Sequence, residues 1–159
     1  MPSPTTHSGD IGETDFLAKA TKKGFRVSQP YGKDYPYDSI LDNGLIRFLM
    51  QIKSTAYLAR EDVYLARCGR PIGTYPKKIV PYLESEVDFV SIYVIPEDSW
   101  THIPIGALRG RTSIYIYSRH HKKQGEWEPF RENWDLFRQH QTPAVAELMR
   151  KIREKALKG

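Results

Sequence analysis

The chain has 159 residues, of which 40% are hydrophobic, 27% charged and 12% aromatic. These proportions are ordinary for a globular protein and exclude wholesale disorder, while the length suits one domain with appendages better than two full domains. No apolar run approaches the roughly 20 residues that span a bilayer, the first ten residues lack a secretory signal, and the single cysteine, Cys68, cannot form an internal disulfide. We therefore expect a cytoplasmic protein with no membrane anchor.

Apolar residues at helical spacing predict one helix near each end of the chain. After a mobile leader over residues 1–9, the first helix runs from Asp10 to Lys23, and Gly24 ends it. Over residues 141–159, Thr142 is a typical helix cap and begins an amphipathic helix that continues to the C-terminus. This second helix needs a surface to pack on, either on the domain or on another subunit.

The region between the helices is rich in short apolar runs and predicts a β-sheet, so that the fold class is α/β. Residues 88–95 are continuously apolar and β-branched, which is typical of a strand buried on both faces, and we expect them at the centre of the sheet. Residues 69–81 are rich in Gly and Pro and predict a loop, and residues 132–140 predict a short helix. The other predicted strands cover residues 25–28, 37–41, 46–55, 62–67, 100–105 and 113–118.

The net charge of +5 indicates an anionic partner only weakly, but the basic residues are unevenly distributed. Residues 63–83 and 102–125 contain lysine and arginine and no acid. Such segments suit a phosphate-binding face, because each cation that neutralises a phosphate releases a counterion; scattered solvated charge is the alternative interpretation. The candidate DNA-binding residues are Arg70, Lys77, Lys78, Arg109, Arg111, Arg119, Lys122 and Lys123.

Three polar residues on two neighbouring predicted strands form the main candidate for a catalytic site. The dipeptide Asn43-Gly44 is typical of a tight hairpin, which would place Asp38 beside the strand that carries Gln51 and Lys53. Side chains alternate along a strand, so Gln51 and Lys53 point to the same face. A carboxylate, an amide oxygen and an ammonium would then converge, and this set suits Mg²⁺-assisted hydrolysis of a phosphodiester.

Each of these residues also has a simpler interpretation. Asp38 could be a surface aspartate beside a turn, Lys53 a charge that protects an edge strand, and Gln51 a hydrogen-bonding strand residue. Glu13, on the first predicted helix, could bring a second carboxylate to the same metal, or it could only favour the helix dipole. The register of the first three residues favours a catalytic role over the simpler interpretations.

Several short motifs along the chain resemble those of one nuclease superfamily. They are Gly9-Asp10-Ile11-Gly12-Glu13, Gly24-Phe25-Arg26-Val27-Ser28-Gln29-Pro30, Tyr37-Asp38 and Gln51-Ile52-Lys53-Ser54-Thr55. In this order the sequence resembles the PD-(D/E)XK nuclease superfamily, and most closely its group I intron-encoded homing endonuclease branch, from about Gly9 to about Phe137. The departure from the superfamily pattern is Gln51, where an amide replaces the usual acid; by the resemblance this is a feature of the branch.

The resemblance implies a restriction-endonuclease-like core, with a mixed sheet flanked by helices, over residues 10–140, and it leaves the C-terminal helix at 141–159 unmatched. It implies Mg²⁺, with Mn²⁺ as a substitute, held by Asp38, Gln51, the Ile52 carbonyl and Glu13, while Lys53 orients or activates the water. It also implies double-stranded DNA as substrate and a homo-oligomer, a dimer or a tetramer, because one chain has one active site.

Two other functions stay open from the sequence alone. A catalytically inactive DNA-binding module would use the same basic segments and would bind DNA without metal-dependent nicking. A structural interaction domain, with the C-terminal helix as its working part, would not bind DNA at low salt.

Overall fold

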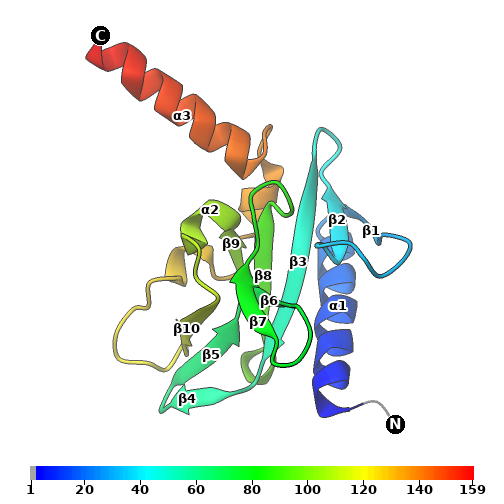
Figure 1. The fold of residues 1–159 in the computed structure, drawn as a ribbon. Coiled ribbons are helices and arrows are strands. Elements are labelled where there is room, and N and C mark those ends of the chain that lie inside the picture. The colour runs from blue at the N-terminus through cyan, green and yellow to red at the C-terminus, as the bar shows by residue number, and fades with distance from the viewer. Residues whose placement is uncertain (1–2) are drawn as a thin grey trace.

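The structure is a computed structural model that describes residues 3–159, with a five-stranded sheet at its centre (Figure 1). The strand order is β1-β2-β3-β8-β9; β3 and β8 are parallel and the other neighbours are antiparallel, so the sheet is mixed, as predicted. The strands are β1 (Arg26–Ser28), β2 (Ser39–Asp42), β3 (Arg47–Thr55), β8 (Phe89–Val94) and β9 (Ser99–Pro104).

Helix α1 (Pro4–Lys22) packs against β3 and begins earlier than the sequence indicated. The expected start at Asp10 was wrong, because the Ser3 hydroxyl accepts a hydrogen bond from the Thr6 backbone N–H and caps a first turn that opens with proline. Residues 4–9 are therefore helical instead of forming a leader, and the part of that prediction covering residues 1–2 lies outside the described residues. Gly24 follows the helix with a φ of 91°, a conformation that suits glycine at a helix end.

The buried strand β8 lies beside the middle of the sheet. All six of its residues are buried, which explains its continuous apolar run. The middle strand is β3, with β2 on one side and β8 on the other, so the expectation that residues 88–95 form the exact centre was wrong by one strand. The predicted helix at 132–140 is a 3₁₀ turn over Trp134–Arg138.

A smaller layer of strands covers the other side of the sheet (Figure 1). The predicted loop at 69–81 was wrong: β6 and β7 pair there as a hairpin around a turn at 73–77. Gly69 allows this pairing, because a Cβ at that position would lie 2.8 Å from the Val80 carbonyl oxygen. The strands of this layer are β4 (Leu58–Arg60), β5 (Val63–Arg67) and β10 (Ser113–Tyr117) in one sheet, and β6 (Gly69–Ile72) and β7 (Lys78–Pro81) in the other.

The core consists of two apolar clusters. One is rich in aromatic side chains and contains Phe16 from α1 together with Trp100, Trp134 and Phe137. The other joins β8 and β9 to β5 and β10 and includes Trp127. Together these clusters hold α1 on β3 and the smaller layer on β8. The paired strands β2 and β3 are thereby held in place between α1 and the smaller layer.

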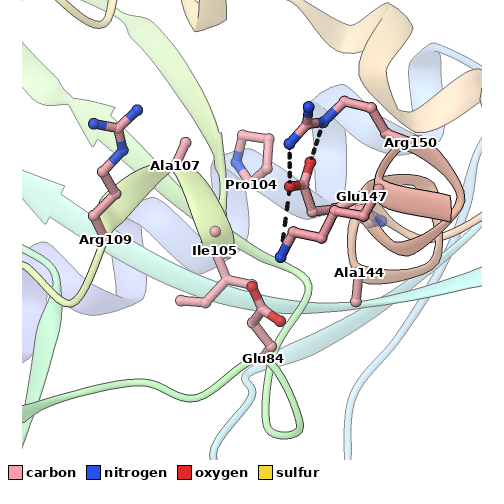
Figure 2. Close-up of a pocket in the computed structure, with 11 residues that line it drawn as sticks. Glu84, Pro104, Ile105, Ala107, Arg109, Ala144, Glu147 and Arg150 are labelled. Atoms are coloured by element: carbon pink, nitrogen blue, oxygen red, sulfur yellow. Dashed lines mark hydrogen bonds and ion pairs between the residues drawn. The ribbon is translucent and has the colours of Figure 1, made fainter. Parts of the chain in front are cut away.

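Helix α3 (Pro143–Lys158) projects from the domain and buries none of its residues (Figure 1). It begins at Thr142, as predicted, where the hydroxyl accepts a hydrogen bond from the Val145 backbone N–H. A cavity of about 440 Å³ separates it from α2 (Ile105–Leu108), and Figure 2 shows Glu147 there paired with Arg150. Over residues 3–159 no helix combines the length and apolar character needed to cross a membrane.

Candidate active site

Asp38 lies immediately before β2 (Ser39–Asp42) and beside the middle of β3. The Asp38 backbone N–H donates to the Met50 carbonyl at 2.8 Å. For the N–H of Ile52, further along β3, the acceptor is the Asp38 side chain and not a strand carbonyl. Its Oδ2 accepts hydrogen bonds from the Ile52 N–H at 2.9 Å and from Gln51 Nε2 at 2.6 Å. Both bonds use Oδ2, so Oδ1 is the oxygen that remains for another partner. Burial raises the pKa of Asp38, against the lowering effect of the Ile52 hydrogen bond and of the Lys53 charge.

Lys53 lies two residues after Gln51 on β3, within electrostatic range of the Asp38 carboxylate. Its ammonium Nζ stands over the Tyr82 ring, 5.6 Å from the ring centroid, in a cation–π contact. Burial lowers the pKa of Lys53, while the negative charge of Asp38 opposes this effect. Asp38 and Gln51 are therefore in direct contact, and the Lys53 ammonium lies within electrostatic range of the Asp38 carboxylate.

Glu13 approaches the site from α1, and a close contact between helix and strand makes this possible. A Cβ on the neighbouring Gly12 would lie 2.1 Å from Ser54 Oγ, so glycine lets α1 approach β3 at this level. Burial raises the pKa of Glu13, and the negative charges of Asp38 and Asp10 raise it further. The second carboxylate predicted from the sequence thus lies within electrostatic range of the first.

Two surface cavities of about 440 Å³ each share Asp38 in their lining. One also contains Glu13 and the loop after β1, with Tyr35 and Tyr37. The other contains Gln51 and, from the opposite wall, Arg70 and residues that follow β7. Asp38 therefore lines a cavity on each of two sides.

The residues at this point fit a divalent cation of the Mg²⁺ type. Carboxylates from Asp38 and Glu13, the Gln51 amide and the Ile52 carbonyl are hard oxygen donors, which Mg²⁺ and Mn²⁺ prefer. Gln51 Nε2 lies 2.6 Å from Asp38 Oδ2 and 3.4 Å from the Ile52 oxygen, so it stands between two of these donors, and a half-turn of the amide would present its oxygen instead. Among residues 3–159 no group of three or more His, Cys, Asp and Glu side chains could hold a metal, so a site here depends on the neutral donors.

The basic residues predicted to bind DNA are distributed over several surfaces. Arg70 lies on β6 and lines the cavity beside Asp38 and Gln51, whereas Lys77 and Lys78 lie on the exposed part of the hairpin at its turn. Arg109 ends α2 and lines the cavity below α3, away from Asp38. The structure thus brings Arg70 to the candidate site and leaves Arg109 outside it.

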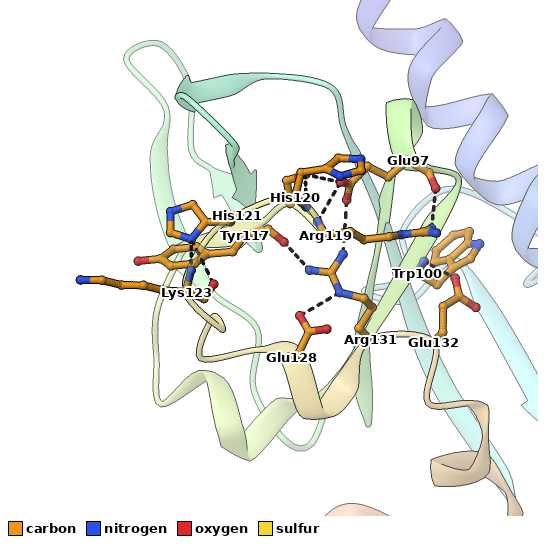
Figure 3. Close-up of polar contacts among 11 residues, drawn as sticks. Glu97, Trp100, Tyr117, Arg119, His120, His121, Lys123, Glu128, Arg131 and Glu132 are labelled. Carbon is orange, nitrogen blue, oxygen red and sulfur yellow. Dashed lines mark hydrogen bonds and ion pairs between the residues drawn. The ribbon is translucent and has the colours of Figure 1, made fainter.

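The remaining basic candidates belong to the layer of β10. Arg111 pairs with Glu126 at 2.9 Å and covers the Trp127 ring. Arg119 donates to the Glu97 carbonyl oxygen at 2.7 Å within a polar network that Arg131 completes (Figure 3). These two guanidinium groups therefore have partners inside the chain, while the exposed part of the following loop carries Lys122 and Lys123.

Sequence patterns did not reveal two residues of the site. Tyr82 packs its ring below Lys53, and Glu86 pairs with Arg70 at 2.7 Å. Both lie in a segment with no alternation or recognisable motif near them, and their contacts bridge distant parts of the chain. The sequence pattern predicts a loop at 69–81, whereas recognising the β6–β7 hairpin there would have indicated that the chain returns toward β3.

The comparison with protein families identifies the chain as a member of a nuclease family. A sequence profile described as "PD-(D/E)XK endonuclease" matches residues 3–137, and the chain belongs to this family. The match ends before α3, which is consistent with an element added to the family core.

Among solved structures, the chain is similar to a bacterial homing endonuclease, I-Ssp6803I. The TM-score is 0.74 at 22% sequence identity, over 85% of this chain and 93% of that one, so the two share a fold. A second structure, MepB, aligns with a TM-score of 0.44 at 15% identity over 74% of this chain and 88% of that one. No curated protein matches the sequence.

Proposed function

We propose that the protein is a Mg²⁺-dependent DNA endonuclease that hydrolyses phosphodiester bonds, of the homing or restriction type. The observation that supports this most strongly is the contact of Asp38 with Gln51 at the start of β2, with Lys53 in electrostatic range and Glu13 approaching from α1. Oxygen donors that line a cavity, with an ammonium in electrostatic range of them, suit phosphodiester hydrolysis.

Each residue of the site has a distinct role in the proposal. Asp38, Glu13, the Gln51 amide oxygen and the Ile52 carbonyl would hold the divalent ion, which when bound would contribute Lewis acidity toward the phosphate. The Lys53 ammonium orients the attacking water or exchanges a proton with it. The Tyr82 ring restricts where that ammonium can lie. The products would carry 5′-phosphate and 3′-hydroxyl ends.

We further propose that the active form is a homo-oligomer, a dimer or a tetramer. One chain offers one set of Asp38, Gln51 and Lys53, whereas cutting both strands of DNA needs two such sites. At low protein concentration we therefore expect nicked circles, and at higher concentration linear DNA.

A cleavage assay on supercoiled plasmid, with Mg²⁺, with Mn²⁺ and with a chelator, tests the proposal. Replacing Lys53 by methionine should lower the cleavage rate about 10²- to 10⁴-fold, the usual contribution of a proton-transferring group, with little change in DNA binding. Asp38→Asn should abolish the response to metal. Lys22→Met is the matched control, because it removes an exposed cation at the end of α1, outside the site, and should cleave as wild type does.

A catalytically inactive DNA-binding module is the second candidate, and the position of the Gln51 amide nitrogen between Asp38 and Ile52 is the observation that favours it. It predicts binding that weakens steeply with salt and no nicking with either metal. Metal-dependent nicking by wild type, lost in Lys53→Met, would exclude it.

A further inference from the structure

The wall of the site opposite Asp38 comes from the β6–β7 hairpin and the loop that follows it, residues 69–86. Arg70 from β6 and Glu86 from the loop line the same cavity of about 440 Å³ as Asp38 and Gln51. The hairpin is held tightly, since Arg70 pairs in register with Val80 and Gly69 leaves no room for a side chain against the Val80 backbone. The cavity that contains the Asp38 carboxylate is thus also lined by a basic residue on a well-held hairpin.

The Arg70 guanidinium is held in place but keeps donors to spare. Its Nη2 donates to Glu86 Oε1 at 2.7 Å, and Glu86 is itself fixed because its other oxygen accepts the Leu83 N–H at 2.9 Å. Arg70 Nε is buried and has no hydrogen-bond partner among residues 3–159. A buried N–H without a partner is costly, and the pairing with Glu86 offsets part of that cost.

The charges around the cavity explain why an anion needs this residue. Asp34, Asp38 and Glu86 bring negative charge to the lining, and Lys33 and Arg70 bring positive charge. A DNA phosphate that approaches Asp38 is repelled unless cations stand on the other side. An arginine fork suits this position, because it can donate two parallel hydrogen bonds to one phosphate.

We propose that Arg70, held by Glu86, binds a backbone phosphate of the DNA strand that is being cut. The inference rests on the proposed function for its substrate, DNA, and adds a phosphate-binding residue to the wall opposite Asp38. The same loop carries Tyr82 under Lys53, so the phosphate-binding residue and the lysine share one support.

Four variants measured in parallel test this role: Arg70→Met, Arg70→Lys, Glu86→Gln and the control Arg67→Met. Arg67 is exposed and lies at the end of the adjoining strand β5. Its replacement by methionine removes the same positive charge as Arg70→Met does. We expect Arg70→Met to lower kcat on the order of 100-fold, as for loss of one donor to a reacting phosphate. Arg70→Lys should recover only part of the rate. Glu86→Gln should lower the rate by less than Arg70→Met does, because the amide oxygen can accept from Arg70 or from the Leu83 N–H, whereas the carboxylate accepts from both.

A second readout does not depend on cleavage. A plot of the logarithm of the binding constant for duplex DNA against the logarithm of salt concentration, measured without divalent metal, has a negative slope. In Arg70→Met this slope should become shallower by about one, because one phosphate contact is lost. In Arg67→Met it should stay unchanged. If wild type binds DNA but does not cleave it, this loss of slope still supports the inference while the nuclease proposal fails. If wild type cleaves and Arg70→Met retains both its rate and its salt slope, the inference is wrong. Thermal unfolding of every variant distinguishes these outcomes from a loss of fold.

Discussion

Replacing Gly12 by alanine tests the contact that brings Glu13 to the site. Gly12 faces β3 from α1, and a Cβ there would lie 2.1 Å from Ser54 Oγ but 3.5 Å from Ser54 Cβ. The steric conflict is therefore with one hydroxyl. That hydroxyl is buried and has no hydrogen-bond partner within residues 3–159. Replacing Ser54 by alanine should remove both the conflict and the unpaired group.

The magnitudes follow from these contacts. Alanine in place of glycine inside a helix gains about 1 kcal/mol of stability, and overpacking a tight contact costs about 1–3 kcal/mol, so Gly12→Ala alone should destabilise by about 1 kcal/mol. Ser54→Ala should stabilise by about 1 kcal/mol, since a buried unpaired hydroxyl is lost. The double variant keeps both gains without the conflict, and we expect it to be about 2 kcal/mol more stable than wild type.

Urea unfolding at 25 °C of the four proteins gives the coupling between the two positions, which should be about 2 kcal/mol. The double variant should also keep its cleavage rate, because α1 can again approach β3 and leave Glu13 in place. If the two single effects simply add, the close approach at Gly12 does not limit the packing of α1, and the reasoning fails.

Two further predictions concern the charge of the site and the core. Gln51→Glu should tighten Mg²⁺ binding, which would be seen as a larger rise in unfolding temperature when Mg²⁺ is added. The variant should also destabilise the metal-free protein, because two carboxylates then face each other across the present 2.6 Å contact with Asp38. An unchanged response of the unfolding temperature to Mg²⁺ would contradict the prediction. Burial among aromatic rings lowers the pKa of His102 to about 3, so between pH 6.5 and 3 only the unfolded chain takes up that proton and stability falls as the pH falls. Between pH 7 and 5 the Ser91→Ala/His102→Phe variant should therefore lose about 2 kcal/mol less stability in urea than wild type does, and equal losses would contradict the assignment.

Local patterns were sufficient to predict the parts of the site that lie on regular elements. The alternation of β3 predicted Gln51 and Lys53 on one face, and the Asn43-Gly44 signal predicted that β2 folds back beside β3; the hairpin is present, but its loop covers residues 43–46, with Asp42 paired to Arg47, and is longer than the tight turn predicted. Both signals are short-range, since they depend on the period of a strand and the geometry of one turn. Asn43 in this loop also donates hydrogen bonds to the Phe137 and Gln139 carbonyls, so distant residues support the hairpin as well.

The other wall of the site depends on contacts that no local pattern encodes. Glycine and proline in residues 69–81 favour a loop, yet β6 and β7 pair there because Gly69 lets the strands approach closely. The contact of Tyr82 with Lys53 joins residues 29 positions apart, across that mispredicted segment. The early start of α1 has a different cause, because the polar residues after Pro4 concealed a capped first turn.

The neutral side chain at position 51 changes the balance between metal and phosphate at the site. With Gln51, the two carboxylates of Asp38 and Glu13 outweigh the Lys53 ammonium by one negative charge. A bound divalent ion then makes this group positive, whereas with an acid at position 51 the same ion would only neutralise it. A positive site attracts a DNA phosphate, and Arg70 on the opposite wall adds to that attraction. We therefore expect Gln51→Glu to weaken DNA binding in the presence of metal even as it tightens the metal itself, a pairing of effects that a purely structural role for Gln51 would not produce.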